Sequence, residues 1–119
     1  MTAVATKARK SPIGFRASEA SSLRLLARQA DDAAQLLKLL GNEKRLLILC
    51  FLAERGEMTV GQLVHAVKLS QSALSQHLAK LRVDRLVEYR RTSQTLHYRV
   101  ADRRAMRMLH VLKEIYCND

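Results

Sequence analysis

The sequence predicts a mainly α-helical domain that carries one small β-hairpin. The 119 residues include only four Gly and one Pro, too few for the many tight turns of an all-β fold. Apolar residues recur at three- and four-residue spacing through most of the chain, which is the helical period. After Leu86 the pattern changes, and β-branched or aromatic residues alternate with charged ones, as in a half-exposed hairpin.

Residues 1–18 are small, polar and basic, a composition typical of a flexible N-terminal arm. The folded domain is expected over residues 19–119, and it opens with an apolar seam at helical spacing. The members of this seam are Leu23, Leu26, Ala30, Ala33, Leu37 and Leu40. They predict one helix or two consecutive helices. The seam serves either for packing within the chain or as a dimer interface.

Gly41 and Asn42 end this segment, because Gly suits the position after a helix and Asn suits the N-cap of the next one. A helix is therefore expected over residues 43–55, closed by Gly56. Residues 46–53 are apolar on every side of the helical wheel, which predicts the central buried helix of the domain.

Two short helices follow. Thr59 is a suitable N-cap for a helix through Val67, and Ser70 is a suitable N-cap for a helix over residues 71–82. Only Lys68 and Leu69 separate these helices. Two helices joined by so tight a turn predict a helix-turn-helix.

The hairpin is expected from strands over residues 87–91 and 95–100, with a turn at 92–94. A last helix is expected at about residues 103–116. Its apolar residues, which are expected to be buried, are Met106, Leu109, Leu112, Ile115 and Tyr116.

The net charge of +10 indicates a polyanionic partner, either nucleic acid or, as the second choice, an acidic membrane surface. Residues 68–107 contain ten Lys or Arg and three acids, a local charge of +7 over the second helix of the helix-turn-helix, the hairpin and the start of the last helix. No apolar run approaches the roughly 20 residues of a membrane span, and no secretory signal is recognised. We therefore expect a cytoplasmic protein that binds nucleic acid and no membrane.

A helix-turn-helix followed by an arginine-rich hairpin is the order of a winged helix-turn-helix that binds double-stranded DNA. On the predicted helix 71–82, Leu74, Leu78 and Leu81 share one side. The opposite side has short polar side chains and no acid, which favours insertion into the major groove over a merely solvated face. The expected base contacts are Gln71, Ser72, Ser75 and Gln76.

Contacts to the DNA backbone or an adjacent minor groove are expected from a second set of residues. Ser70 and the helix N-terminus suit a phosphate, and Lys80 adds a positive charge. His77 lies beside the apolar side, so it either packs there or contacts a phosphate. Arg90 and Arg91 flank the hairpin turn and either reach DNA or belong to an ordinary solvated hairpin.

Three stretches resemble a known family: residues 39–49, 69–81 and 94–99, above all Ser70-Gln-Ser-Ala-Leu-Ser-Gln-His-Leu78. The resemblance is to the ArsR/SmtB repressors, and it covers roughly residues 29–117. The resemblance implies a helical homodimer in which the first and last helices pair. The two recognition helices would then enter successive major grooves of an imperfect inverted repeat. Two positions depart from the family pattern, since Arg85 and Ser93 stand where its members usually have Gly.

Many ArsR/SmtB members sense metals, but this sequence lacks their ligands. Thr59 and Gly61 occupy the two cysteine places of the thiolate metal box. In the last helix, Arg104, Ile115 and Asn118 stand where the zinc site of other members has ligands. No metal site and no cofactor are predicted.

Cys50 and Cys117 resemble the cysteine pair of the family branch that senses sulfide and persulfide, so the expected signal is sulfide, persulfide or an oxidant. That resemblance implies a bridge within one protomer, formed by a disulfide or polysulfide, that releases DNA. Judged from its neighbours alone, Cys50 would instead be a small buried hydrophobe in an apolar helix.

The sequence thus predicts a transcriptional repressor controlled by a thiol switch. An activator that displaces a silencing nucleoid protein remains the alternative, since related members act in that way. The sequence contains no catalytic dyad and no phosphate-binding loop that would indicate an enzyme. Without selective DNA binding, a protein-interaction module would be the remaining choice.

Overall fold

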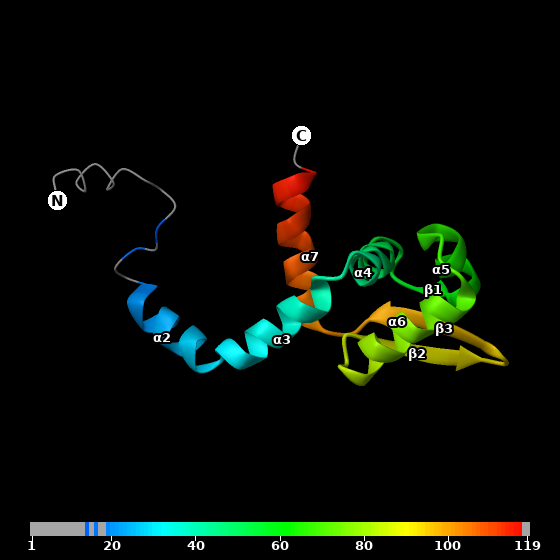
Figure 1. The fold of residues 1–119 in the computed structure, drawn as a ribbon, viewed down its shortest axis with the longest axis horizontal. Helices are drawn as coiled ribbons and strands as arrows, with labels where there is room; N and C mark the ends of the chain where they lie inside the picture. The colour runs from blue at the N-terminus through cyan, green and yellow to red at the C-terminus, as the bar shows by residue number, and fades with distance from the viewer. Residues whose placement is uncertain (1–13, 15, 17–18, 118–119) are drawn as a thin grey trace. The chain divides into compact units, whose positions relative to one another are not determined.

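The computed structural model describes residues 14, 16 and 19–117, which belong to two compact units divided after Ala34. Helices and strands follow one another along the chain as labelled in Figure 1. The elements are α2 (Ala20–Arg28), α3 (Ala30–Leu40), α4 (Glu43–Arg55), β1 (Met58–Thr59), α5 (Val60–Val67), α6 (Gln71–Val83), β2 (Val87–Thr92), β3 (Thr95–Val100) and α7 (Arg103–Tyr116). The predicted class, mainly helical with a small β wing, is confirmed.

The apolar seam at the start of the domain forms two consecutive helices, the second of the two predicted possibilities. The break falls at Gln29, whose N–H donates to the carbonyl of Leu26 at 2.9 Å. In α2, Leu25 and Leu26 are more than half exposed. The predicted arm of residues 1–18 lies outside the described residues except for Gly14 and Arg16.

α4 lies at the centre of the second unit. It begins where the Asn42 side chain accepts from the Arg45 N–H at 3.0 Å, and it ends at Gly56, whose φ of 84° suits only glycine well. Ile48, Leu49 and Leu52 are fully buried. The prediction that α4 is buried on every side is wrong, because Cys50 is exposed on the side turned away from this core.

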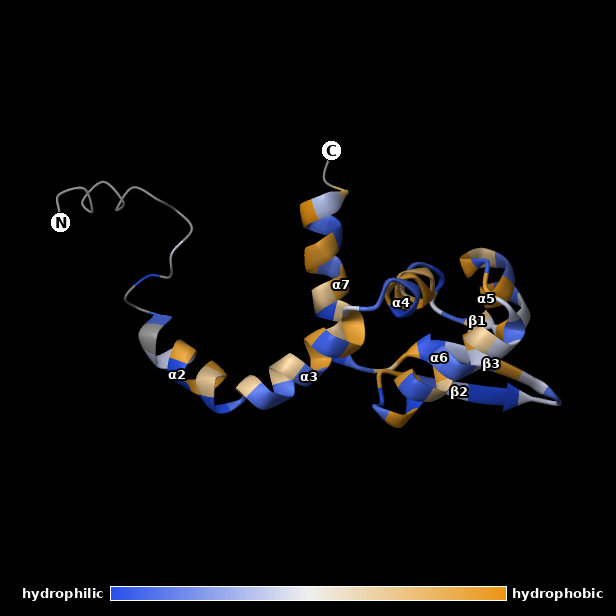
Figure 2. Cartoon of the chain, in the orientation of Figure 1, coloured by the Kyte–Doolittle hydropathy of each residue, from blue (hydrophilic) through white to orange (hydrophobic). Residues whose placement is uncertain are grey.

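The core is formed by side chains from every helix and strand of the second unit. It gathers Leu39, Leu40, Ile48, Leu49, Leu52, Met58, Leu63, Val67, Leu74, Leu78, Leu81, Leu86, Val87, Tyr98, Ala105 and Leu109. Figure 2 shows hydrophobic and hydrophilic residues, in orange and blue, following one another along α4 and α6, as expected of helices with one buried side. The three leucines of α6 anchor the predicted recognition helix as expected.

Side-chain caps set the helix-turn-helix. Thr59 and Gln62 form a reciprocal capping box at the start of α5, with N–H to oxygen distances of 2.9 and 3.2 Å. α5 ends at Lys68 in the left-handed conformation, with φ 56°. The Ser70 hydroxyl then accepts from the Ala73 N–H at 3.1 Å and starts α6. Both predicted N-caps are confirmed.

The wing is a three-stranded antiparallel sheet in the order β1-β3-β2, rather than a hairpin alone. β1 pairs Met58 with Tyr98, and β2 pairs Tyr89 with Tyr98 from the other side. The two-residue strand β1 was missed because it is too short to show an alternating pattern. Thr92 pairs with Thr95, so the connection is the two residues Ser93 and Gln94, one fewer than predicted.

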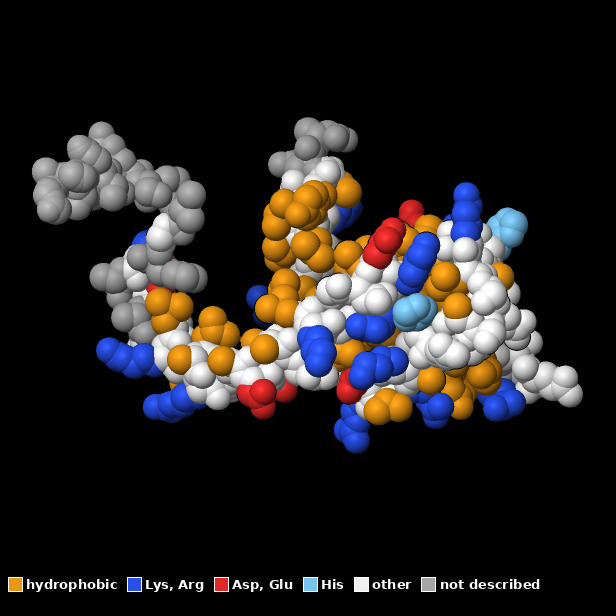
Figure 3. All heavy atoms as spheres, in the orientation of Figure 1, with side chains coloured by type: hydrophobic (Ala, Val, Ile, Leu, Met, Phe, Trp, Pro, Cys, Tyr) orange, Lys and Arg blue, Asp and Glu red, His pale blue; other side chains and the backbone are white. Residues whose placement is uncertain are grey.

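α7 is capped by Asp102, whose carboxylate accepts from the Arg104 and Ala105 N–H groups at 2.7 and 3.1 Å. Leu109 is buried as predicted, whereas the predicted burial of Ile115 and Tyr116 is wrong, since they are 63% and 80% exposed. The reason is that the last turns of α7 extend past the core of their own chain. Figure 3 shows apolar side chains as an orange band on these turns, and Figure 2 shows the same part of the ribbon with several residues coloured as hydrophobic.

Candidate DNA-binding surface

α6 presents the outer face that the sequence predicts. Ser70 at its N-cap is exposed, and the four residues assigned to base contacts, Gln71, Ser72, Ser75 and Gln76, are all exposed too. No acidic residue occurs between Gln71 and Val83. Because small polar side chains cover this face, the helix backbone can approach the edges of base pairs closely.

The residues of α6 assigned to the DNA backbone differ in their surroundings. Lys80 is exposed, with its ammonium 4.0 Å from a carboxylate oxygen of Asp84, a weak exposed pair. His77 is half-buried at the border between the outer face and the core. Its position suits either of the two roles predicted for it.

The two arginines of the wing face opposite sides of the sheet. Side chains alternate along a strand, and Arg90 pairs with His97 while Arg91 pairs with Leu96. Arg91 therefore shares the face of Leu96 and Tyr98, the face turned toward α6. Arg90 points to the other face.

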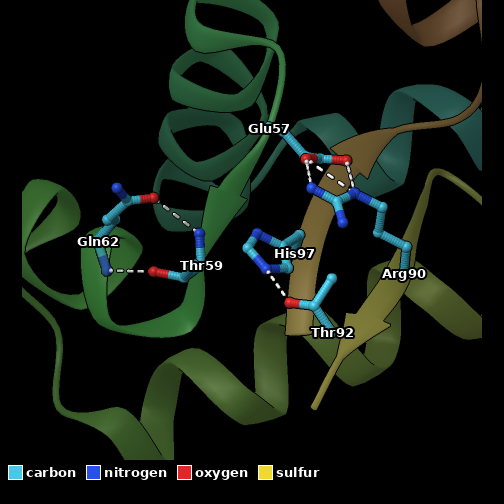
Figure 4. Close-up of polar contacts among 6 residues, drawn as sticks. All are labelled: Glu57, Thr59, Gln62, Arg90, Thr92 and His97. Carbon is cyan, nitrogen blue, oxygen red and sulfur yellow. Dashed lines mark hydrogen bonds and ion pairs between the residues drawn. The ribbon is translucent and has the colours of Figure 1, made fainter. Parts of the chain in front are cut away.

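On that other face, Arg90 binds Glu57, which precedes β1 (Figure 4). Its Nε and Nη2 donate to the two carboxylate oxygens at 2.9 to 3.1 Å. These hydrogen bonds lower the pKa of Glu57, with a further contribution from the positive charge of Arg90 itself. Thr92 and His97 also contact each other there, with Oγ1 and Nε2 2.8 Å apart. The charge of Arg90 is thus largely offset within the protein.

A groove of about 550 Å³ separates α6 from the wing. Its walls are Gln71, Ser75, Leu78, Ala79 and Arg82 from α6, Gln94, Thr95, Leu96 and Tyr98 from the hairpin, and Thr59, Val60 and Gly61 around the start of α5. Two predicted base-contacting residues, Gln71 and Ser75, therefore border the groove. It runs beside the face that would enter the major groove.

Three residues of this groove were not predicted to belong to the surface: Arg82, Gln94 and Thr95. The helical period could have placed Arg82 near Ser75 and Ala79, because these positions recur at three- and four-residue spacing. Its closeness to the wing could not be predicted, since that depends on the packing of α6 against β2.

Cys50 lies on α4 and Cys117 is the C-cap of α7. Both are free and exposed, and α4 packs against α7. Partial burial raises the pKa of Cys50, and the negative charge that Cys117 carries as a thiolate raises it further. The two predicted redox residues therefore lie on helices that pack against each other.

Two residues in the regions of the family's metal sites cap helices instead. Thr59 caps α5 and Asp102 caps α7, whereas Asn118 lies outside the described residues. Among residues 19–117, no three His, Cys, Asp or Glu side chains gather as metal ligands. Within the same residues, no helix combines the length and apolarity needed to cross a bilayer.

A capped helix-turn-helix with an acid-free outer face, flanked by an antiparallel wing, defines a winged helix-turn-helix regulator that binds DNA. The family described as "Bacterial regulatory protein, arsR family" matches residues 42–89. The nodulation protein NolR of Rhizobium meliloti is 49% identical over 90 residues, covering 76% of this chain and 73% of its own. The chain belongs to the ArsR family of transcriptional regulators.

Two further relatives support this family. The transcriptional activator HlyU of Vibrio cholerae is 43% identical over 96 residues, covering 81% of this chain and 88% of its own. The structure of reduced HlyU matches with a TM-score of 0.74 over 80% of this chain and 99% of HlyU. The transcriptional repressor BigR of Xylella fastidiosa matches with a TM-score of 0.76 and 34% identity, over 81% and 97% of the two chains.

Proposed function

We propose that this regulator is a cytoplasmic homodimer that represses transcription while Cys50 and Cys117 are reduced and releases DNA when they are bridged. The proposal includes no catalytic activity and no metal. The observation that carries it is the pair itself, two exposed thiols on α4 and at the end of α7, two helices that pack against each other.

The position of the pair provides a route to the DNA-binding surface. α4 packs against α7 and also against α5 and α6, the two helices of the helix-turn-helix. A disulfide needs its two Cα atoms about 4.4–6.8 Å apart, and a polysulfide spans more. A bridge between Cys50 and Cys117 would fix the end of α7 against α4. The resulting change in the angle between α7 and α4 would be transmitted through α4 to α6.

A polysulfide such as H₂S₂ can form the bridge without another oxidant. One cysteine thiolate attacks a sulfur of HS–SH, forming a cysteine persulfide and releasing HS⁻. The second thiolate attacks the cysteine sulfur of that persulfide, forming the disulfide and releasing a second HS⁻. The two cysteines together lose two electrons, which reduce the two sulfur atoms of H₂S₂ to sulfide.

The homodimer is proposed from the exposed apolar side chains of α7. Val111, Ile115 and Tyr116 are 44%, 63% and 80% exposed on its outer turns, and the first two lie about one helical turn apart. An exposed stripe of this kind on a helix is suited to a second copy of the same helix related by a two-fold axis. An inverted repeat in double-stranded DNA would match that symmetry.

The test compares reduced and polysulfide-treated protein in a gel-shift assay, with a duplex that the reduced protein selects from a random pool. We expect treatment to abolish binding by the wild type and to leave binding by Cys50→Ser and Cys117→Ser unchanged. Mass spectrometry should show the Cys50–Cys117 linkage only in the treated wild type. A Cys50→Ser variant that releases DNA as readily as the wild type contradicts the switch.

Activation of transcription is the second candidate function, because HlyU is described as an activator whereas BigR is described as a repressor. An activator of this kind would displace a silencing nucleoid protein from the promoter. Transcript levels after deletion of the gene separate the two functions: repressed targets rise and activated targets fall.

A further inference from the structure

Arg82 is the only charged residue among the described walls of the groove between α6 and the wing. It follows Ser75 and Ala79 along the α6 side of this groove, and the hairpin residues Gln94 and Thr95 border it too. A DNA backbone strand lies between a helix in the major groove and a wing beside it. The groove therefore has the place and the lining expected for a backbone segment.

Aromatic contacts hold Arg82 in position. Its guanidinium carbon lies 4.4 Å from the centre of the Tyr89 ring, within the range of a cation–π contact. Tyr89 in turn packs on Tyr98, with ring centres 5.3 Å apart and planes tilted by 58°. Tyr98 is buried, so this stack connects Arg82 to the core. Stacking covers one face of the guanidinium and leaves the N–H groups in its plane able to donate.

Arg82 also differs from two arginines of the wing in its ion-pair partners. Arg90 is bound to Glu57 at 2.9 Å and Arg99 to Glu88 at 2.7 Å. Within the described part of the chain, no acidic side chain forms an ion pair with Arg82. Its positive charge is therefore available to a ligand, whereas the charges on the far face of the wing are offset.

We infer that Arg82 binds a phosphate of the DNA backbone in this groove and that Tyr89 is the positioning residue that orients its guanidinium. Arginine is suited to this role because its planar donors match two phosphate oxygens at once. The inference rests on DNA binding by this surface and does not depend on the thiol switch.

The test uses reduced protein and a fluorescein-labelled 30-base-pair duplex of random sequence, with affinity measured by anisotropy across a series of KCl concentrations. The logarithm of the association constant falls linearly with the logarithm of the salt concentration. Loss of one phosphate contact per protomer should make this fall less steep, by about 1.8 in slope per dimer. For Arg82→Gln we expect that reduction together with a roughly tenfold weaker Kd. Arg99→Gln removes the same charge from the opposite face of the wing and is the matched control.

Equal slopes for Arg82→Gln and Arg99→Gln would overturn the assignment. Arg82→Lys keeps the charge but loses the planar donors, so it should keep the wild-type slope with a severalfold weaker affinity. This variant also serves as the test if Arg82→Gln fails to fold by circular dichroism. A wild-type affinity of Arg82→Lys contradicts the phosphate contact through the guanidinium.

The positioning role is tested with two substitutions of its ring. Tyr89→Phe keeps the aromatic face and should retain wild-type affinity and slope, whereas Tyr89→Leu should weaken binding severalfold and reduce the slope as Arg82→Gln does. If Tyr89→Leu binds random duplex like the wild type at every salt concentration, Tyr89 does not orient Arg82.

Discussion

The side chain of Asp102 makes the stability of the α7 N-terminus depend on pH. Partial burial alone would raise the pKa of its carboxyl group, but the hydrogen bonds from Arg104 and Ala105 outweigh burial and lower the pKa. A carboxylate whose folded pKa is lowered stabilises the fold above its unfolded pKa. The contribution is lost as the pH falls through the folded value. The acid limb of stability should therefore depend on this residue.

We expect Asp102→Ala to lower the free energy of unfolding by about 1 kcal/mol at pH 7, because α7 loses its N-cap. The difference from the wild type should shrink toward pH 2. Asp102→Asn is the control, since the amide oxygen still accepts from the backbone but carries no charge. Urea titrations between pH 2 and 7 measure both variants, and a wild-type pH profile for Asp102→Ala would contradict the assignment.

The ion pair between Glu57 and Arg90 leads to a prediction about DNA affinity when the carboxylate of Glu57 is removed. Glu57→Gln removes the acid that offsets Arg90, so the wing gains one positive charge while the fold loses only an exposed pair. We expect random duplex to bind roughly two- to fivefold more tightly at low salt, with the gain screened at high salt. Glu54→Gln, on the exposed side of α4, tests whether net charge alone explains the gain.

At the scale of elements, the end of α6 has the geometry of a Schellman motif. The Leu86 N–H donates to the Leu81 carbonyl and the Arg85 N–H donates to the Arg82 carbonyl, each at 2.9 Å. Arg85 occupies the left-handed position of this motif with φ 62°, where Gly is the usual residue. Ser93, in the two-residue turn between β2 and β3, also has a left-handed conformation, with φ 57°. The two departures from the family pattern thus coincide with strained backbone.

Arg85→Gly should raise the free energy of unfolding by about 0.5–1 kcal/mol, because glycine adopts this conformation without steric cost. Arg85→Ala removes the same charged side chain but keeps the Cβ atom, so it should show no such gain. Thermal unfolding of the two variants distinguishes relief of backbone strain from loss of a charge. Equal stability of both variants would contradict the explanation.

Local signals predict the helices well, because a helix is specified by neighbours in the sequence. Asn42, Thr59 and Ser70 each accept from a backbone N–H three residues later, so the cap and its partner can be recognised together. The buried leucines of α6 follow from the period of 3.6 residues in the same way. The outer face of α6 is therefore predicted as soon as its inner face is known.

Contacts between distant residues are not predicted in this way. Glu57 and Arg90 are 33 residues apart and meet only through the register of the sheet. The burial expected for Ile115 and Tyr116 was wrong for a related reason. A helical pattern shows which residues share a face, but it does not show whether that face meets the core of its own chain or a partner.

At the scale of the whole molecule, the exposed stripe on α7 has to be reconciled with a highly charged chain. A net charge of +10 keeps copies apart through repulsion, so association needs a surface from which charge is absent. The outer turns of α7 offer Val111, Ile115 and Tyr116 together. Val83 on α6 is just as exposed, at 78%, but it stands alone between the charged residues Arg82 and Asp84. These two places provide a matched pair for testing dimer formation.

We expect Ile115→Glu to give a monomer in light scattering after size exclusion, whereas Val83→Glu should remain a dimer. A buried, unpaired carboxylate at the centre of the α7 stripe opposes pairing strongly, because its desolvation has no compensation. The monomer should bind an inverted-repeat duplex roughly 100-fold more weakly, because the second half-site no longer adds to affinity. A single half-site should bind Ile115→Glu and the wild type about equally. A dimeric Ile115→Glu would show that α7 does not form the interface.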